Sequence, residues 1–543
     1  MSSKRFLRGT FLLTFATMTS KFLGFIYVVP FTILVGTQGY ILYEYAYKPY
    51  TIILSMATMG VPLAVSKFVS KYNAMGDYYT GRRLFRSGLL LMTFTGLITC
   101  LLLFFLAPFL ATLLSDGADA GNTPEQITFV IRMVSFALLV VPIMSLIRGY
   151  FQGFQSMGPT ASSQVVEQIV RLVFILAASL LVLQVFRGSI SAAVGLATFG
   201  AFVGAVGGLV VLLRYWSKRR HDLNELLRQS TVRNEVTLPA MYKELITYAI
   251  PFVIVGLAIP LYQTADTYMV NSALRGIGYT LLEAESVNSA ISLAQKLILI
   301  PVSLATAFSL SLIPAITQSY TARDLRTLHQ QVTQTFQTLL WLTVPASIGL
   351  SLLAYPAYTT LFGLNNNPEL GGYVLQWYAP TAIMLALFSV TAAMLQGINR
   401  QRAAVVGFIG GFLIKLATNY AFIQQFAEVG TVLTTNIGLF FSISFNMWVL
   451  HRFAYYRYRQ LLKPLLQIAL AVGCMAVIVW GVKYALTAVL PNIMAHQYVQ
   501  AILVLLTGVV AGVVSYFMLS VRLGLFHRLL GRRRQALNKG HQT

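Results

Sequence analysis

The stretch Leu-Ala-Gln-Lys-Leu-Ile-Leu-Ile-Pro, residues 293–301, places one lysine inside a segment that is otherwise apolar. Lys296 is the only charged residue between Ser286 and Gln318. A run of this length and composition is typical of a transmembrane helix, yet a lysine at the centre of a bilayer costs at least about 2.5 kcal/mol. We therefore expect this segment to be one span of a larger helical bundle, with Lys296 facing its interior or a water-filled cavity.

The composition of the whole chain is typical of a polytopic membrane protein. Of its 543 residues, 57% are hydrophobic and 10% are charged, whereas soluble proteins carry about 25% charged residues. Cys100 and Cys474 lie far apart in apolar runs, a pattern that predicts neither a disulfide framework nor a metal site. The N-terminal apolar stretch is longer than the core of a signal peptide, so we expect it to remain as the first transmembrane helix.

Fourteen apolar runs are long enough to cross a membrane, at about 20 residues each. They lie at residues 11–36, 50–70, 86–114, 127–149, 160–186, 190–214, 245–272, 286–318, 332–362, 372–397, 403–425, 430–450, 464–488 and 497–520. Most of the 39 Lys and Arg residues fall in the termini and in every second loop, which predicts that both termini are cytoplasmic. We attribute the net charge of +23 to this loop asymmetry and to affinity for anionic membrane lipids rather than to nucleic-acid binding.

The chain also contains an internal repeat. Tyr-Phe-Gln-Gly at 150–153 matches Met-Leu-Gln-Gly at 394–397, and a cation follows eighteen residues after the glycine of each motif, namely Arg171 and Lys415. Parallel repeats of this kind are a transporter architecture, with the binding site between the two halves near the middle of the membrane.

The repeat and the loops predict five regions. They are a six-helix lobe at 1–214, a basic cytoplasmic linker at 215–242, a second six-helix lobe at 243–450, two additional transmembrane helices at 451–520 and a basic cytoplasmic tail at 521–543. The expected fold is thus all-α, with two lobes that are direct repeats and two further helices at the C-terminus.

Several charged residues lie deep within the predicted spans: Lys21, Glu167, Arg171, Asp266, Lys296 and Lys415. Glu167 and Arg171 are four residues apart, so they can pair on one helix face, either as a structural ion pair or as cavity charges. Lys415 is either structural or lines the second lobe. Asp266 either pairs with a cation of the other lobe or binds a coupling ion. Lys48, Arg187 and Arg275 are expected in outer loops or at span ends.

Lys21 and Lys296 differ from the other charges because neither has an acid at helical spacing within its own span. Two such cations, one from each lobe, would give a shared cavity a positive potential. That potential suits an anion such as a phosphate or pyrophosphate headgroup. The alternative is that other spans supply acidic partners for both lysines.

Prolines are a further feature of the predicted spans 1, 2, 7 and 8. A proline inside a helix removes a backbone hydrogen bond and tends to kink the helix, so these residues are hinge candidates. They are Pro30, Pro62, Pro251, Pro260, Pro301 and Pro314.

Four motifs carry a resemblance to a known family. Ser-Lys-Phe-Leu-Gly-Phe at 20–25, Ala-Gln-Lys-Leu-Ile-Leu-Ile-Pro at 294–301 and Leu-Ile-Pro at 312–314 resemble segments of the MurJ lipid II flippases. Gly-Val-Pro-Leu-Ala-Val-Ser-Lys-Phe-Val-Ser-Lys-Tyr-Asn at 60–73 is similar to the SpoVB/YtgP branch of that family. The family belongs to the multidrug/oligosaccharidyl-lipid/polysaccharide exporter (MOP) superfamily, which includes the MATE transporters, and the resemblance covers about the whole chain.

The resemblance implies roles for particular residues. Lys21 and Lys296 stand where the family has essential cavity arginines, so the positive charge is kept while the two-pronged guanidinium is lost. Tyr27 replaces a second arginine of the family, and Gln295 replaces an acid. The two lysines would hold the substrate's pyrophosphate, and the last two spans would flank a groove for its lipid tail.

The function that the resemblance implies is outward flipping of the undecaprenyl-pyrophosphate-linked peptidoglycan precursor, lipid II, by alternating access in the bacterial plasma membrane. No cofactor or metal is expected, and either the membrane potential or a coupling ion would drive transport. Partners would be the anionic lipid-linked substrate and the cell-wall synthesis machinery.

Two alternatives share parts of this pattern. A near rival is a flippase for another polyprenyl-linked oligosaccharide, such as a capsule or teichoic-acid unit, because the sequence discriminates poorly between the sugars. A MATE-type drug/cation antiporter is disfavoured, because cationic cargo calls for acids in the cavity. An enzyme that uses the same lipid is disfavoured, because the predicted outer loops are short and all six histidines lie in loops or the tail.

Overall fold

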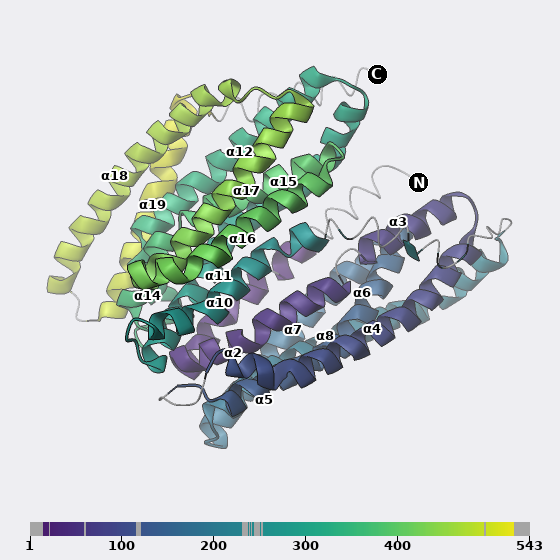
Figure 1. Ribbon diagram of the computed structural model, residues 1–543, viewed down its shortest axis with the longest axis horizontal. Coiled ribbons are helices and arrows are strands. Elements are labelled where there is room, and N and C mark those ends of the chain that lie inside the picture. Colours follow the sequence, from purple (N-terminus) through teal and green to yellow (C-terminus); the bar gives the residue numbers. More distant parts are fainter. Residues whose placement is uncertain are drawn as a thin grey trace. The chain divides into compact units, whose positions relative to one another are not determined.

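The computed structural model describes residues 15–20, 22–58, 61–115, 121–230, 253–493 and 496–525, together with isolated positions between 237 and 250. These residues form helices joined by short turns, and no strand occurs among them. The predicted all-α class is therefore confirmed. The chain divides into two compact units, of which unit 1 holds Met1–Asn271 and Thr280–Glu285, and unit 2 holds Ser272–Tyr279 and Ser286–Thr543. Figure 1 shows the helices of both units, coloured along the chain.

Unit 1 is a bundle of long helices. They are α2 (Val28–Thr58), α3 (Val61–Ala74), α4 (Tyr78–Thr112), α5 (Pro124–Ser135), α6 (Ala137–Gly153), α7 (Gly158–Leu180), the π-helical turn η1 (Leu181–Val185), α8 (Ile190–Arg228) and most of α10 (Ala258–Arg275). Helices α3, α4, α6 and α8 pack together, as the ribbon shows (Figure 1). Their shared core contains Phe85, Met144, Tyr150 and Leu212, each at most 3% exposed.

Unit 2 continues from the long helix α11 (Leu281–Thr321), whose first residues belong to unit 1. It contains α12 (Leu325–Leu352), α13 (Ala354–Phe362), α14 (Pro368–Tyr378), α15 (Thr381–Gly397), α16 (Gln401–Phe426), η2 (Ala427–Val429), α17 (Gly430–Ala454), η3 (Tyr458–Leu461), α18 (Leu462–Ile493) and α19 (Gln497–Arg522). Helix α18 packs on α19 and α12 around a core that includes Ile468, Met475, Val479 and Tyr516.

The sequence marks several helix starts with side chains that accept backbone hydrogen bonds. Asp77 accepts from the backbone N–H of Thr80 at the start of α4. Thr123 and Gln126 form a reciprocal capping box at the start of α5. At the start of α12, the hydroxyl and the backbone N–H of Thr327 both donate to Asp324, and these bonds lower the pKa of that exposed carboxyl.

The helices repeat at a constant separation along the chain. Helix α5 begins at Pro124 and α14 at Pro368, and the next helices begin at Ala137 and Thr381. These latter helices, α6 and α15, are both 17 residues long and end at Gly153 and Gly397. Each pair is 244 residues apart, which is also the offset between the repeated Gln-Gly motifs. Equivalent stretches of sequence therefore form equivalent helices within each unit.

The connection predicted between spans 1 and 2, at 37–49, is instead helical and buried within α2. The break lies just before it, at Gly36, whose φ of 68° suits glycine because it lacks a Cβ atom. The segment looked like a loop because it is rich in tyrosine and contains Glu44 and Lys48. Both charged residues are at most 5% exposed, so Lys48 does not lie in an outer loop, while its position relative to the end of a span stays a prediction.

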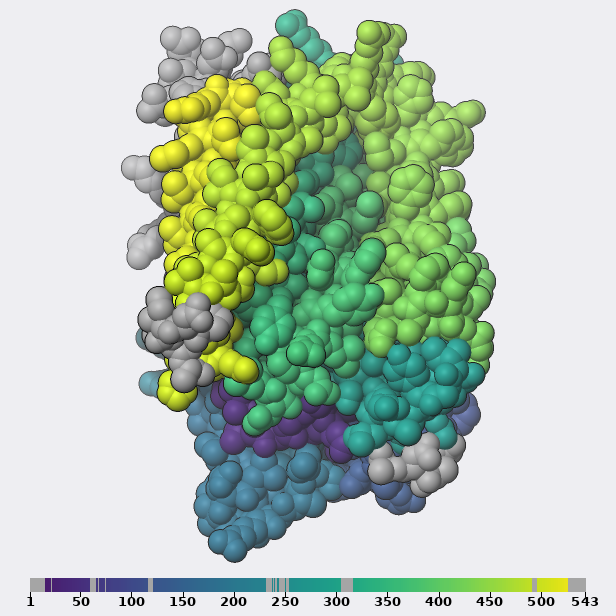
Figure 2. All heavy atoms as spheres, turned by 90° about the vertical axis from the view of Figure 1, so that its left-hand side faces the viewer, coloured from purple at the N-terminus to yellow at the C-terminus, as the bar shows by residue number. Residues whose placement is uncertain are grey.

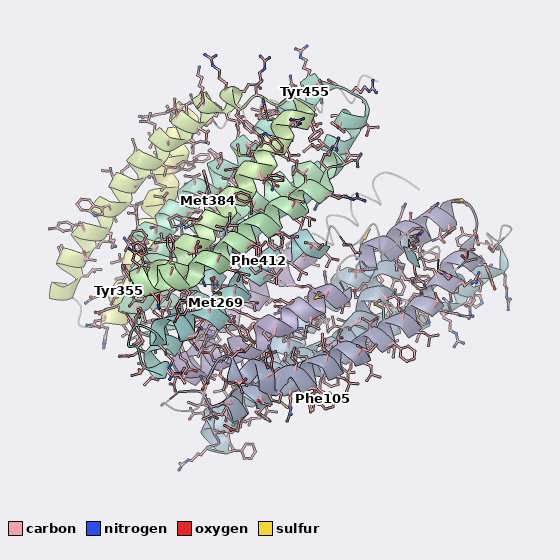
Figure 3. All side chains as sticks on the ribbon, viewed as in Figure 1. Phe105, Met269, Tyr355, Met384, Phe412 and Tyr455 are labelled. Atoms are coloured by element: carbon pink, nitrogen blue, oxygen red, sulfur yellow. The ribbon has the colours of Figure 1, made fainter. Side chains whose placement is uncertain are left out.

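Large apolar side chains cover the outside of the bundles, as expected for helices that face lipid. Phe105 projects from α4 (Figure 3) and is 72% exposed, and Leu466 and Val477 on α18 are at least 70% exposed. Within the described residues, nine helical segments are long and apolar enough to cross a membrane, or ten if α14 and α15, bent by 41°, form one span. One of these segments, Gln401–Ala454, contains both α16 and α17. The count of fourteen spans stays a prediction.

Candidate substrate site

Lys21 lies outside the described residues, but the helical segments on both sides of it pack on α7. The hydroxyl of Thr17 donates to the Gln164 side chain at 3.3 Å. One turn beyond Lys21, a Cβ atom on Gly24 would lie 3.1 Å from the Gln168 amide nitrogen. The first helix therefore lies against the polar side of α7, which also carries Glu167.

Glu167 is the centre of a group of three charged residues in unit 1. Its two carboxylate oxygens pair with Arg171 at 3.0 Å, on the same helix, and with Arg148 at 2.9 Å, on α6. Arg148 also donates to the Ser163 hydroxyl at 2.8 Å. The spacing of Glu167 and Arg171 indicated their pair, whereas nothing in the sequence singled out Arg148. No local spacing reveals Arg148 as a partner, because it comes from a different helix.

Tyr27, which stands where the related family has an arginine, is connected to this charged group through two other tyrosines. Its hydroxyl lies 2.9 Å from that of Tyr43, and the Tyr43 ring stacks on Tyr47 with centroids 5.2 Å apart. The Tyr47 hydroxyl in turn accepts from Arg171 at 3.3 Å. The described cation that contacts these tyrosines therefore belongs to α7, and Tyr27 itself contributes a neutral phenol.

Buried polar residues also gather where α2 meets α10. Lys48 pairs with Glu44 at 3.8 Å and donates to the hydroxyl of Thr267 on α10. Asp266, the residue before Thr267, is fully buried. Asn271, one turn after Thr267 on α10, donates to the hydroxyl of Tyr45 at 2.6 Å. Asp266 thus lies on a helix that makes several polar contacts inside unit 1, and its part in ion coupling stays a prediction.

Glu285 extends these contacts at the start of α11 and was not singled out in the sequence. It is fully buried and accepts from the backbone N–H and the side-chain amide of Asn122, each at 3.1 Å to the same oxygen. The Tyr45 hydroxyl donates to it at 3.4 Å. Neutral donors rather than cations make these contacts. The sequence around an acid does not reveal such neutral partners, because any residue except proline can supply a backbone N–H.

In unit 2, Lys415 on α16 is fully buried against α17. Its ammonium group donates to the Thr435 hydroxyl at 2.5 Å and lies 3.5 Å from the carbonyl and hydroxyl oxygens of Thr431. Next to it, Thr434 donates to Asn419 at 2.7 Å. These oxygen atoms compensate a charge that would otherwise be costly in the membrane. The contacts support the structural alternative for Lys415.

Gln295 and Lys296 are neighbours on α11 with different surroundings. Gln295 is buried and donates to the hydroxyl of Tyr378 on α14 at 3.2 Å. Lys296 is only partly buried. The glutamine that replaces the family's acid therefore serves as a contact between two helices of unit 2.

The proposed hinge prolines occupy two kinds of position. Pro30, Pro62 and Pro260 lie in the first turn of α2, α3 and α10, where no intrahelical bond is lost. Pro301 and Pro314 lie inside α11, which continues as a helix past both. Pro251 lies outside the described residues. The hinge role of these residues stays a prediction.

Unit 2 also contains a hollow surface. In Figure 2, a depression runs between α18 on one side and the α16–α17 pair on the other, with α12–α15 at its base. Lys483 of α18 donates to the carbonyl of Leu352, at the end of α12, at 2.8 Å. Elsewhere α18 exposes apolar side chains such as Leu470 and Trp480. No group of three metal-ligating side chains occurs in the described part of the chain.

Comparisons with known proteins agree on one family. Residues 6–320 match the model of the polysaccharide biosynthesis protein family. The chain is 46% identical to the protein named lipid II flippase MurJ of Bacillus subtilis (strain 168), over 98% of each chain. It is 24% identical to the stage V sporulation protein B of the same organism, over 76% of this chain and 77% of that protein.

Two solved structures share the fold. A lipid II flippase MurJ in an inward closed conformation matches with a TM-score of 0.67 and 14% identity, over 96% of this chain and 99% of that one. An inward-facing multidrug resistance MATE family transporter of the MOP superfamily matches with a TM-score of 0.65 and 14% identity, over 79% and 94% of the two chains.

Proposed function

Because the chain belongs to the MurJ lipid II flippase family, within the polysaccharide biosynthesis proteins of the MOP superfamily, we propose that it flips lipid II from the inner to the outer leaflet of the bacterial plasma membrane. The observation that carries this assignment is the 46% identity over 98% of both chains. The fold alone does not choose the cargo, since flippase and drug-exporter structures match with TM-scores of 0.67 and 0.65. A chain of this family is a transporter and not an enzyme.

Lys21 and Lys296 are the residues that we assign to the anionic headgroup. Both stand at positions of the family's cavity cations, and Lys296 is partly buried on α11. Two ammonium groups attract a pyrophosphate through charge, without the fixed two-pronged geometry of arginine. We assign Arg171 to the stability of the lobe, because it forms an ion pair with Glu167, which also pairs with Arg148.

We assign the long lipid tail to the additional helices. The depression between α18 and the α16–α17 pair (Figure 2) offers a surface bordered by exposed apolar side chains. An apolar chain in such a groove stays out of water while the headgroup crosses.

We also propose that both termini are cytoplasmic. In that orientation, a cysteine introduced at Asn365 should react with a reagent added from outside.

A growth experiment tests the proposed function. The gene is expressed in a bacterium depleted of its own lipid II flippase, and exposure of lipid II on the outer leaflet is measured alongside growth. We expect both to be restored. If growth fails while the protein accumulates in the membrane, and a capsule or teichoic-acid flippase mutant is rescued instead, the cargo is another polyprenyl-linked oligosaccharide.

A further inference from the structure

Arg82, on the second turn of α4, carries a positive charge that no carboxylate among the described residues balances. Its Nε and Nη1 atoms are buried and make no hydrogen bond. No ion pair to Arg82 occurs in the part of the chain that the structure describes. A buried donor left unsatisfied costs about 1–3 kcal/mol, and more when the group is charged. Arg82 contacts Tyr150 and Trp216, but no carboxylate among the described residues pairs with it, which points to an anion supplied from outside the chain.

Aromatic rings hold the Arg82 side chain in place. The centre of its guanidinium lies 4.5 Å from the ring centroid of Trp216, on α8. Trp216 stacks on Phe85 at 5.0 Å, and Phe85 lies 4.3 Å from Tyr150 of α6. A stacked ring covers only a face of the guanidinium, while every N–H group points outward in its plane. A fixed guanidinium plane is suited to two parallel hydrogen bonds with a phosphate.

The charges around Arg82 are mostly positive. Arg219 of α8 lies over the same aromatic cluster, 6.0 Å from the Phe151 ring, and donates to the Ser156 hydroxyl. Arg83 and Arg86 follow Arg82 on α4 and are exposed. Among the acids of the packed elements, Asp77 is buried and caps α4, whereas Asp222 and Glu225 on α8 are exposed. We call Arg82, Arg86 and Arg219 the basic corner. In the described part of the chain, no acid forms an ion pair with it.

Helix α4 leads from the basic corner directly to an apolar outer face. Leu90, one turn after Arg86, is 66% exposed, and Phe94, one turn further, is 61% exposed. One turn of helix spans about 5.4 Å. A molecule with an anionic head and acyl chains could therefore bind the corner with its head and lie along α4 with its tails. We propose that the basic corner is a binding site for the headgroup phosphate of an anionic phospholipid such as phosphatidylglycerol. This inference does not depend on the cargo of the transporter.

The test measures lipid binding to the purified full-length chain by native mass spectrometry. Phosphatidylglycerol and phosphatidylcholine with identical acyl chains are the two probes. Arg82→Gln should weaken phosphatidylglycerol binding about tenfold, the loss expected for a charge-assisted pair of hydrogen bonds. Arg83→Gln is the matched control, because it removes the same charge from the exposed adjacent position, and it should change affinity less than about twofold.

Three outcomes would overturn the proposal. Equal losses for Arg82→Gln and Arg83→Gln would mean that only general surface charge attracts the lipid. Equal affinity of the parent chain for both lipids would mean that the headgroup is not read. Displacement of the lipid by an equal concentration of inorganic pyrophosphate would mean that the site binds free phosphate groups. If Arg82→Gln does not accumulate, Arg82→Lys replaces it, since lysine keeps the charge but loses the fork and should weaken binding more than Arg83→Lys does.

Discussion

At the residue scale, charges within the bundles are stabilised by partners from neighbouring helices. Glu167 receives one arginine from its own helix and another from α6. Lys415 donates to hydroxyl and carbonyl oxygens of α17. In both cases protein groups compensate the charge, as a charge inside a membrane protein requires. A charge that serves the cargo must instead keep part of its surface available, as partly buried Lys296 does.

The cavity role of Lys296 predicts a graded series of substitutions. Lys296→Arg should retain flipping, because the related family uses arginine at this position. Lys296→Gln should reduce flipping, and Lys296→Glu should reduce it further by adding repulsion against the pyrophosphate. Rescue of the depleted strain measures the series, and immunoblotting of membranes controls for protein level. Full rescue by Lys296→Glu would contradict the assignment.

The same rescue experiment tests Lys21. Lys21→Ala should be inactive, whereas Lys21→Arg should be active.

The group around Glu167 predicts a loss of stability rather than of cargo binding. Glu167→Gln leaves the partly buried Arg148 and Arg171 without their shared carboxylate; breaking a fully buried pair costs about 3–5 kcal/mol, and we expect a smaller but clear loss here. Thermal unfolding in detergent should show a clearly lowered midpoint. Glu225→Gln, which removes an exposed acid from α8, should leave the midpoint nearly unchanged. A stable Glu167→Gln protein that binds lipid II poorly would instead place this group in the substrate site.

At the element scale, small residues set how closely the helices approach. On α8, a Cβ atom at Gly204 would lie 2.8 Å from both the Arg171 Cβ and the Glu167 carbonyl oxygen of α7. Between α16 and α17, a Cβ atom at Gly411 would lie 2.2 Å from the carbonyl oxygen of Gly438. The α7–α8 and α16–α17 pairs are therefore packed backbone against backbone, as is common in membrane bundles. The charged residues Arg171 and Lys415 lie on these closely packed helices.

Gly411→Ala should consequently destabilise unit 2. The added methyl group would meet both Gly438 and the Ser442 hydroxyl, so α16 and α17 would have to separate, at a cost of about 1–3 kcal/mol. Gly473→Ala on α18 is the matched control, because a Cβ atom there meets nothing within 4 Å. It should be neutral or slightly stabilising, since alanine favours a helix over glycine. Equal unfolding midpoints for the two variants would show that the close contact between α16 and α17 does not limit the stability of unit 2.

At the scale of the whole molecule, the expected driving force follows from charge. A pyrophosphate-linked lipid carries about two negative charges, and each charge that crosses 100 mV gains or loses about 2.3 kcal/mol. With the cell interior negative, outward movement of this anion is favourable, although lysines that move with the site would cancel part of the gain. Under the proposed function, the membrane potential is thus expected to favour outward movement of the cargo.

Collapse of the membrane potential should slow flipping by the wild-type chain. The measurement follows lipid II exposed on the outer leaflet after addition of a potassium ionophore, with potassium adjusted to set the potential. An ionophore that dissipates only the pH gradient serves as the control and separates the potential from proton coupling. Unchanged flipping at zero potential would contradict this mechanism. Slowing by the control ionophore alone would instead indicate a proton as the coupling ion.

The sequence by itself determined the all-helical class, the family and the repeat of helices. These features depend on apolar runs, on motifs and on a separation of 244 residues that recurs in the helix bounds, all of which are local or periodic. It also indicated the Glu167–Arg171 pair, because residues four apart share one face of a helix.

The tertiary structure alone decided which side chains complete these groups. Arg148, Thr435 and Asn122 come from helices or turns that the chain brings near Glu167, Lys415 and Glu285 by folding. It also decided that the segment at 37–49 is a buried helix, because its tyrosines and Lys48 find partners on other elements. Helix periodicity relates residues within one turn or two, whereas contacts between helices depend on packing that a single sequence does not encode locally.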